Sequence, residues 1–210
     1  MTRPPTLYPV IVLVNLKGGT GKTILATHVA EELRAHLVDL DPQGDAFDWA
    51  NRSGFISASQ PDGWEEALEL VAAARLEGPV VLDCPPGLCP AIRAALSVAT
   101  VAVVPAKAAM QDLRAVGRVM ELVDEARTNG NPTLKVGLVL NEARTVTSLA
   151  EVAENALEKV HGAHYLGHIG LRQAFVEAYA AGRAVHSGPA RKETKELLWN
   201  LDRLIRRRKP

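Results

Sequence analysis

Residues 17–23 read Lys-Gly-Gly-Thr-Gly-Lys-Thr, and they stand between an all-apolar run at residues 10–14 and a helical pattern that starts at Lys22. Glycines let the chain turn tightly, so that backbone N–H groups converge on an anion at the positive end of the helix dipole. Lys22 and the Thr23 hydroxyl add groups suited to phosphate oxygens and Mg²⁺. The alternative, a chance glycine-rich turn, is disfavoured by the strand before and the helix after. The stretch therefore predicts a phosphate-binding loop.

Short apolar runs alternate with helical patterns on both sides of this loop. The runs 10–14 and 101–104 are apolar at every position, which is typical of parallel strands covered on both faces. We expect strands at Val10–Asn15, His36–Asp39, Val80–Asp83, Val101–Pro105, Val136–Leu140 and Tyr165–Ile169. We expect helices at Lys22–Leu33, Trp64–Ala74, Pro90–Ala99, Asp112–Arg127, Ser148–Val160, Leu171–Ala181 and Arg191–Arg207. This order predicts the α/β class, with a doubly wound, mostly parallel sheet flanked by helices, as in P-loop NTPases.

Length and composition favour one globular domain over residues 1–210. Hydrophobic residues make up 47% and charged residues 23% of the 210 positions, which is ordinary for a folded domain. No apolar run reaches the roughly 18–20 residues that span a bilayer, and the first nine residues are too polar for a signal peptide. Cys84 and Cys89 are too few for a disulfide framework. We expect a cytoplasmic protein.

The formal net charge is zero, but the charge is spread unevenly. Residues 183–210 hold nine Lys or Arg against three Asp or Glu, a net charge of +6, and the remainder carries −6. This asymmetry indicates an anionic partner at the C-terminal end, where a basic helix and tail are expected at about residues 190–210. A solvated terminal helix with no partner is the simpler alternative.

Carboxylates follow two of the predicted strands. Asp39 and Asp41 are two positions apart in an extended segment, so their side chains point the same way and can reach one site. Asp83 ends the apolar run 80–83, and an acid in this position suits Mg²⁺ held through water. The carboxyl ends of parallel strands share one edge of the sheet, so these acids are expected beside the phosphate loop.

The loop Lys17-Gly-Gly-Thr-Gly-Lys22-Thr resembles the deviant Walker A motif of the ParA/MinD ATPases, whose mark is the additional lysine near its start. The resemblance implies that ATP drives a face-to-face sandwich homodimer, in which Lys17 contacts the phosphates of the partner's nucleotide. Many ParA proteins have a second threonine where this chain has Ile24, a position that contributes chiefly its backbone N–H. The implied ATP-binding residues are Lys17, Gly18, Gly19, Thr20, Gly21, Lys22, Thr23, Ile24 and Asn141.

Other segments match the same family in order along the chain. Asp39-Leu40-Asp41-Pro42-Gln43 resembles its Asp-x-Asp-Pro-Gln switch, and residues 47–50 resemble the helix that follows in small plasmid ParA proteins. The resemblance implies Mg²⁺ held by Thr23, Asp39 and Asp83, an attacking water positioned by Asp41, and adenine read by Asn141. The catalytic residues would be Lys17, Lys22 and Asp41. The prolines usual after residue 105 are replaced here by Lys-Ala-Ala-Met at 107–110.

The resemblance to short plasmid ParA proteins implies ATP-dependent partition. The ATP-bound dimer would bind DNA without sequence preference, associate with the nucleoid, and hydrolyse ATP, weakly until stimulated by a cargo-bound ParB-like or ribbon-helix-helix adaptor. Residues expected to contact DNA are Arg172, Arg183, Arg191, Lys192 and Lys195. Alternatives are a MinD-like membrane-associated positioning ATPase, positioning of a protein cargo, and a biosynthetic P-loop enzyme with its own substrate pocket.

Three further signals are given structural interpretations. The two cysteines could supply only half of the four ligands of an iron–sulfur cluster, so a small buried residue next to Asp83 is the better interpretation of Cys84. His161, His164 and His168 lack an accompanying carboxylate or cysteine, and we expect surface or packing roles for them. Apolar residues 197, 198, 201, 204 and 205 form a helical stripe. We expect it to dock on the sheet rather than on a membrane.

Overall fold

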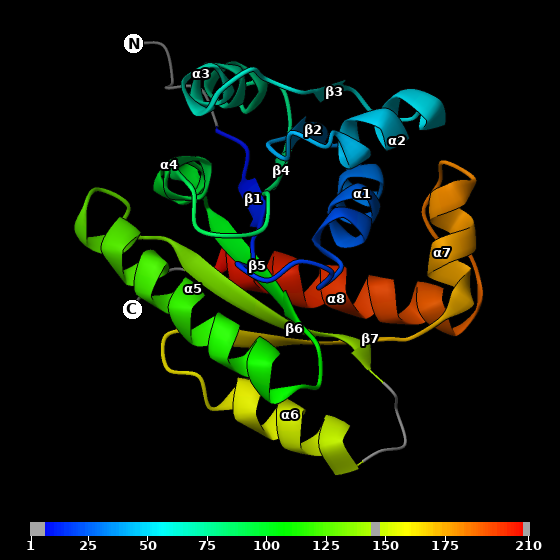
Figure 1. The fold of residues 1–210 in the computed structure, drawn as a ribbon. Helices are drawn as coiled ribbons and strands as arrows, with labels where there is room; N and C mark the ends of the chain where they lie inside the picture. Colours follow the sequence, from blue (N-terminus) through cyan, green and yellow to red (C-terminus); the bar gives the residue numbers. More distant parts are fainter. Residues whose placement is uncertain (1–6, 144–147, 208–210) are drawn as a thin grey trace.

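Seven parallel strands form the central sheet within residues 7–143 and 148–207, the part of the chain that the computed structural model describes (Figure 1). Their order across the sheet is β3-β2-β4-β1-β5-β6-β7. The strand bounds are β1 Val10–Leu13, β2 His36–Asp39, β3 Ala58–Ser59, β4 Val80–Asp83, β5 Val101–Ala106, β6 Lys135–Ala143 and β7 His164–Gly170. The helix bounds are α1 Lys22–Leu33, α2 Asp45–Ser53, α3 Trp64–Ala74, α4 Pro90–Val98, α5 Met110–Thr128, α6 Ser148–Glu158, α7 Gln173–Ala180 and α8 Gly188–Arg206.

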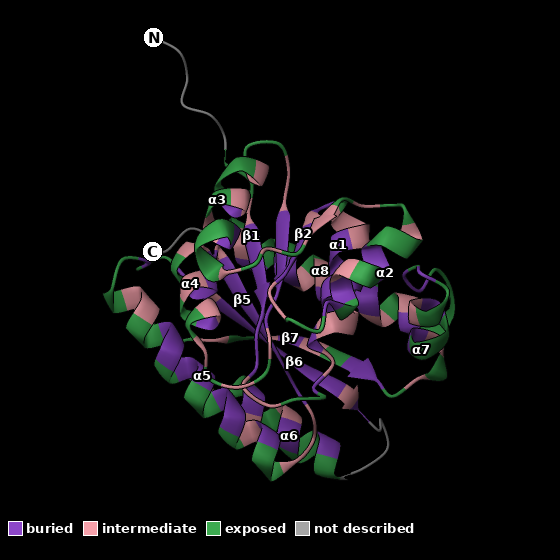
Figure 2. Ribbon diagram, turned by 45° about the horizontal axis from the view of Figure 1, so that its top comes forward, coloured by how far each residue is buried: buried purple, intermediate pink, exposed green. Residues whose placement is uncertain are grey.

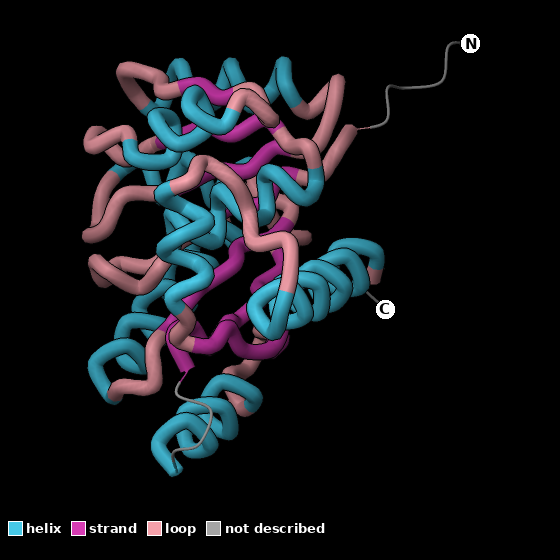
Figure 3. The backbone as a smooth tube through the Cα atoms, turned by 90° about the vertical axis from the view of Figure 1, so that its right-hand side faces the viewer, coloured by secondary structure: helices cyan, strands magenta, loops and turns pink. Residues whose placement is uncertain are grey.

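Helices cover both faces of the sheet (Figures 1 and 3). Helices α3, α4, α5 and α6 pack on one face, and α1, α2, α7 and α8 pack on the other. Successive residues of β1 alternate between the two cores: Val10 and Val12 contribute to the first, and Ile11 and Leu13 to the second, each with no exposed surface. The expectation from the uninterrupted apolar runs, strands buried on both sides, is therefore confirmed (Figure 2).

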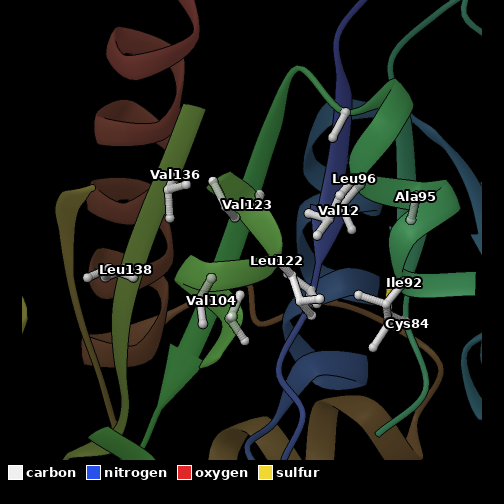
Figure 4. Close-up of a cluster of buried hydrophobic side chains, with 14 of the residues drawn as sticks. Val12, Cys84, Ile92, Ala95, Leu96, Val104, Leu122, Val123, Val136 and Leu138 are labelled. Carbon is white, nitrogen blue, oxygen red and sulfur yellow. The ribbon is translucent and has the colours of Figure 1, made fainter. Parts of the chain in front are cut away.

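Part of the first core is built by side chains from three adjacent strands and two helices. Figure 4 shows Val104 of β5 and Val136 of β6 beside Leu122 and Val123 of α5, and Val12 of β1 beside Leu96 of α4. Burying a side chain of this size is worth roughly 1.5–3 kcal/mol relative to leaving it exposed. The sheet that carries the functional loops is thus fixed from both sides.

The predicted elements are confirmed, with differences at particular positions. Strand β3 was not predicted, because two residues without an apolar run carry no strand pattern. Strand β6 extends to Ala143, beyond the expected end at Leu140, because Ala143 pairs with Gly170 of β7. Helix α8 starts at Gly188, earlier than expected, with proline in its first turn. No helix among the described residues has the length and hydropathy needed to cross a bilayer.

The apolar stripe of the C-terminal helix α8 packs on the sheet, as predicted. Leu197, Leu201 and Leu204 of α8 are at most 3% exposed and belong to the second core. The exposed side of α8 carries Lys192, Lys195 and Trp199, and the Arg203 guanidinium lies 4.4 Å from the centre of the Trp199 ring. Arg208 and Lys209 of the expected basic tail lie outside the described residues.

A histidine lies inside the second core, where α1 packs against α7. The His28 ring nitrogen Nδ1 is 2.7 Å from the Ile24 carbonyl oxygen, and the ring centre is 5.2 Å from that of Phe175. Its other nitrogen is buried and has no hydrogen-bond partner among the described residues. Burial lowers the pKa of His28 from 6.5 to about 4, so the folded protein keeps this ring neutral.

Protonation of His28 is expected to make folding acid-sensitive. The unfolded chain takes up this proton below about pH 6.5, whereas the folded chain does so only near pH 4, so stability is lost as the pH falls between these values. Between pH 7 and pH 4 the native protein should lose about 3 kcal/mol more unfolding free energy than His28→Leu. Urea unfolding at a series of pH values measures this, and parallel curves for the two proteins would contradict it.

Candidate functional site

The loop between β1 and α1 lies at the carboxyl edge of the sheet. Gly18 and Gly19 are exposed, and Gly19 and Gly21 adopt φ angles of +69° and +88°, which residues with a Cβ rarely adopt. Gly21 occupies the N-cap of α1, and no side chain of the described residues caps this helix end. The N–H groups in the first turn of α1 are therefore free to bind an anion held by the loop, and the positive end of the helix dipole favours that anion.

Asn141 supports the loop from the end of β6. Its Nδ2 donates a hydrogen bond of 2.7 Å to the Thr20 carbonyl oxygen. A Cβ on Gly21 would collide with the same amide group, so glycine is required here by space as well as by φ. The prediction that Asn141 reads adenine is untested and stays a prediction. Its contact with the loop is a role that the sequence did not indicate.

Asn15 anchors the entrance of the loop, a role that the sequence patterns did not reveal. Its side chain has no exposed surface; Nδ2 donates to the Pro105 carbonyl oxygen at 2.7 Å, and Oδ1 accepts from the Lys17 N–H at 2.9 Å. The loop is thereby tied to the end of β5. The signal in the sequence was a polar residue at the end of an all-apolar strand, where burial requires hydrogen-bond partners.

The two lysines of the loop occupy different places. Lys22 is buried, and its Nζ lies 3.4 Å from the Lys17 carbonyl oxygen, within the loop. Burial lowers the pKa of Lys22, and the nearby Asp83 and Asp41 oppose that shift. Lys17 instead extends to α5, where its Nζ is 2.6 Å from Oδ2 of the buried Asp112. The Lys17 side chain remains 39% exposed.

Asp83 is placed to hold a cation beside the loop. It ends β4 directly opposite Leu13 of β1, and the Thr23 hydroxyl hydrogen-bonds to it. Its Oδ1 is buried without a partner in the described part of the chain, and burial raises the pKa of Asp83 to about 8. A buried carboxylate in this condition favours a bound cation, because the cation replaces the solvation that burial removes. Thr23 and Asp83 therefore fit Mg²⁺, which would neutralise phosphate charge when bound.

The pairing of β2 with β4 brings Asp39 next to Asp83. The hydrogen bonds of the Asp39 side chain, however, are made to backbone groups of the following turn and helix. Its carboxylate accepts N–H groups of Asp41, Ala46 and Phe47 at 2.9–3.0 Å. The last two are free N–H groups in the first turn of α2, whose N-cap, Gly44, has no side chain to offer. Asp39 thus caps α2 from a preceding strand, and its expected part in holding Mg²⁺ remains a prediction.

Asp41 lies on the turn after β2, at the edge of a cleft of about 850 Å³. Its Oδ1 accepts the Gln43 N–H at 3.1 Å, which orients the side chain. The cleft is also lined by Gln60, Trp64 and Pro86. A carboxylate held on a turn at the edge of an open cleft can accept a proton from, or orient, a water molecule.

The five basic residues expected to contact DNA differ in their surroundings. Arg172 forms an ion pair with Glu193, and Arg191 forms one with Glu32. The other three, which are exposed, are Arg183, Lys192 and Lys195.

The segment after β5 lacks the additional prolines usual in the family. Its Lys107 instead forms an ion pair of 2.6 Å with Glu142, the residue after Asn141, and Glu142 has a φ of +52°.

The first strand of the parallel sheet leads through a glycine-rich loop into a helix N-terminus. The loop contains a buried lysine, and the neighbouring strand carries a carboxylate. This combination defines a P-loop nucleotide-binding protein. The family model of the CobQ/CobB/MinD/ParA nucleotide binding domain matches residues 11–185. The chain therefore belongs to this family, the ParA/MinD superfamily of P-loop proteins.

Individual relatives agree with this assignment. Maintenance of carboxysome distribution protein A of Halothiobacillus neapolitanus is 32% identical over 160 residues, which cover 71% of this chain and 74% of that protein. The chromosome-partitioning ATPase Soj of Thermus thermophilus is 33% identical over 190 residues, covering 72% of this chain and 76% of its own. The ATP complex of a McdA variant from Cyanothece has a TM-score of 0.76 at 16% identity, with 98% and 99% of the two chains covered. That last likeness concerns the fold alone.

Proposed function

We propose that this protein is a cargo-positioning ATPase that works as an ATP-driven sandwich dimer. The observation that carries the proposal is the separation of the two loop lysines. Lys22 is buried within its own loop, whereas Lys17 is partly exposed and bound to Asp112 on α5. A lysine directed away from its own loop is suited to the nucleotide of a partner subunit, and Asp112 holds its charge until the partner arrives.

The residues of the site divide the work of ATP hydrolysis. Backbone N–H groups from Gly18 to Ile24 hold the phosphates, and Lys22 neutralises their charge. Mg²⁺, when bound by Thr23 and Asp83, supplies further charge stabilisation. Asp41 orients the attacking water from the cleft beside the loop. These assignments require no movement of the sheet, since the groups already share its carboxyl edge.

The relatives suggest what such an ATPase moves. Two are named for carboxysome distribution and one for chromosome partitioning, so positioning is their common theme and the cargo differs. We propose that an adaptor, ParB-like or ribbon-helix-helix, links the ATPase to its cargo and stimulates hydrolysis. Plasmid or chromosomal DNA is the first candidate cargo and a protein organelle the second. The ATP-bound dimer would reside on the nucleoid.

The alternative functions meet specific obstacles. A MinD-like membrane helix must expose an apolar face, but the apolar residues Leu197, Leu201 and Leu204 of α8 are already buried against the sheet. A biosynthetic enzyme could place its acceptor in the cleft beside Asp41. Lys17 lies outside the residues lining that cleft, so the biosynthetic function would leave the second lysine of the loop without a task.

Substituting the two lysines should give different defects. Lys22→Ala removes the phosphate contact within the same subunit, so nucleotide binding by the monomer should be lost. Lys17→Ala should leave monomer binding within about twofold and block ATP-driven dimerisation, because only the contact across the dimer is removed. Fluorescent ATP binding and size-exclusion chromatography with Mg²⁺ measure the two effects. An equal loss of monomer affinity in both variants would count against the sandwich dimer.

Replacement of Asp41 should separate binding from hydrolysis. Asp41→Ala is expected to bind ATP and dimerise but to hydrolyse it at least roughly 100-fold more slowly, since only the group that orients water is removed. Phosphate release and chromatography with ATP report on the two steps. Asp48→Ala, which removes an exposed acid of α2 nearby, is the matched control and should behave as native protein. Native turnover by Asp41→Ala would refute this role.

The exposed face of α8 is the proposed DNA-binding surface. Arg172 and Arg191 are already paired with acids, so we place the phosphate contacts on the exposed Lys192 and Lys195, with Arg183 nearby in sequence. Lys192 and Lys195 are three positions apart and share one side of the helix. Dimerisation would double the number of these cations presented to one duplex, which explains why ATP should control DNA binding.

DNA affinity of the ATP-bound dimer should depend steeply on salt. Two contacts per protomer give four per dimer, and log affinity should fall against log salt with a slope of about −3.6. Lys195→Ala should reduce the magnitude of that slope by about 1.8 and weaken all sequences alike. Lys159→Ala, which removes an exposed lysine beyond α6 on the other side of the sheet, should leave the slope unchanged. Titrations of duplex DNA at several salt concentrations measure the slopes, and an unchanged slope in Lys195→Ala would contradict the proposed surface.

A further inference from the structure

A small slot of about 60 Å³ lies beside the phosphate loop, where the end of β7 turns into α7. It is lined by Ile24 and Leu25 at the start of α1 and by Asn141 and Glu142 of β6. A further wall is the turn at residues 169–172, and Phe175 and Val176 of α7 also line the slot. Ile24 and Leu25 directly follow the phosphate loop, so the slot adjoins the site of the phosphates, and its apolar side chains suit a flat aromatic ring such as the nucleobase of ATP.

The turn that forms this wall is held from behind by one residue of α8. Glu193 accepts the Gly170 N–H at 3.0 Å and the Arg172 Nε at 3.1 Å, and its Oε1 is 2.5 Å from Arg172 Nη2. The guanidinium lies against Gly170, where a Cβ would stand 3.1–3.3 Å from its atoms. A single carboxylate thus binds both ends of a three-residue segment.

This carboxylate is well shielded. The Glu193 side chain is 12% exposed and the Arg172 side chain 32%. Burial by itself would raise the pKa of Glu193, but the hydrogen bonds from Arg172 and Gly170 outweigh it and hold the pKa below its usual range. Charge-assisted hydrogen bonds of this kind are about twice as strong as neutral ones, and the forked pairing also fixes their geometry.

We propose that Glu193 is a positioning residue for the nucleobase, which holds the turn 170–172 as the rigid wall of the slot through Gly170 and Arg172. The inference rests on the proposed nucleotide-binding function and adds a part that no loop residue supplies. It also gives Arg172 a structural task in place of a DNA contact. Because Glu193 lies between Lys192 and Lys195, the same contact links the proposed DNA-binding face of α8 to the nucleotide.

The simpler alternative is that the ion pair only docks α8 on the sheet. Docking does not require it, since Leu197, Leu201 and Leu204 bury the apolar face of this helix. The two interpretations differ in one measurable respect. A positioning residue affects ligands that have a base and leaves ligands that consist of phosphate alone unaffected, whereas a loosened helix affects both or neither.

The test compares Mg-ATP with magnesium tripolyphosphate, which fills the phosphate loop without a base. Calorimetry on the full-length native protein, Glu193→Gln and Glu193→Ala gives both affinities. We expect about tenfold weaker ATP binding by Glu193→Ala, as when only a tenth of the molecules hold the competent turn, and unchanged tripolyphosphate binding. Glu193→Gln keeps an acceptor for the Gly170 N–H, so its ATP affinity should lie between those of the native protein and Glu193→Ala. Glu196→Gln, an exposed acid on the same helix, is the control and should match native protein for both probes.

Other results would overturn the proposal. Equal weakening of both probes means that α8 acts on the whole fold, and native affinities in Glu193→Ala mean that the turn needs no support. Circular dichroism identifies a variant that fails to fold. In that case Arg172→Ala, which breaks the same pair from its more exposed side, must reproduce the selective loss of ATP affinity, or the proposal is wrong. If native protein binds neither probe, the proposed function itself fails, which is a different outcome from loss in the variants alone.

Discussion

Parallel pairing of β1 with both β4 and β5 is the constraint on which the rest of the site depends. The register places Leu13 opposite Asp83 on one side and opposite Val103 on the other. Because the strands are parallel, their carboxyl ends meet at one edge, and the loop leaves β1 between an acid and the end of β5. The bond from Asn15 to Pro105 then fixes the loop to this edge. A shift of one residue would move Asp83 away from Thr23 and turn its side chain to the other face.

The site concentrates charge in places where water is excluded. Lys22, Asp39, Asp83 and Asp112 are all buried at this edge. Each has a partial solution: a carbonyl oxygen for Lys22, helix N–H groups for Asp39, a hydroxyl for Asp83 and an ion pair for Asp112. Buried ionic groups contribute little to stability when their solvation is incomplete, and groups of this kind cluster at functional sites. A bound phosphate and its cation would complete the solvation that the protein leaves unfinished.

Helix α8 joins two tasks that the sequence presents as separate patterns. Its leucines anchor it to the sheet, and its lysines face solvent. Glu193, between those lysines, reaches back to the turn after β7. The residues of α8 that pack on the sheet and the residue that holds the turn therefore belong to one continuous helix. The proposed basic surface and the proposed wall of the nucleobase slot are thus joined by the Glu193 contacts.

The sequence by itself determined the fold class, the phosphate loop and most element positions. Uninterrupted apolar runs, glycines before a helix and acids after strands are local patterns, and each has a direct physical meaning. The same patterns could not reveal that Asn141 bonds to Thr20, that Asp39 caps α2, or that Arg172 is paired with Glu193. These contacts join residues 7 to 121 positions apart. Only the tertiary structure decided them, because a polar side chain that can bind many partners is committed to one by the packing of the elements around it.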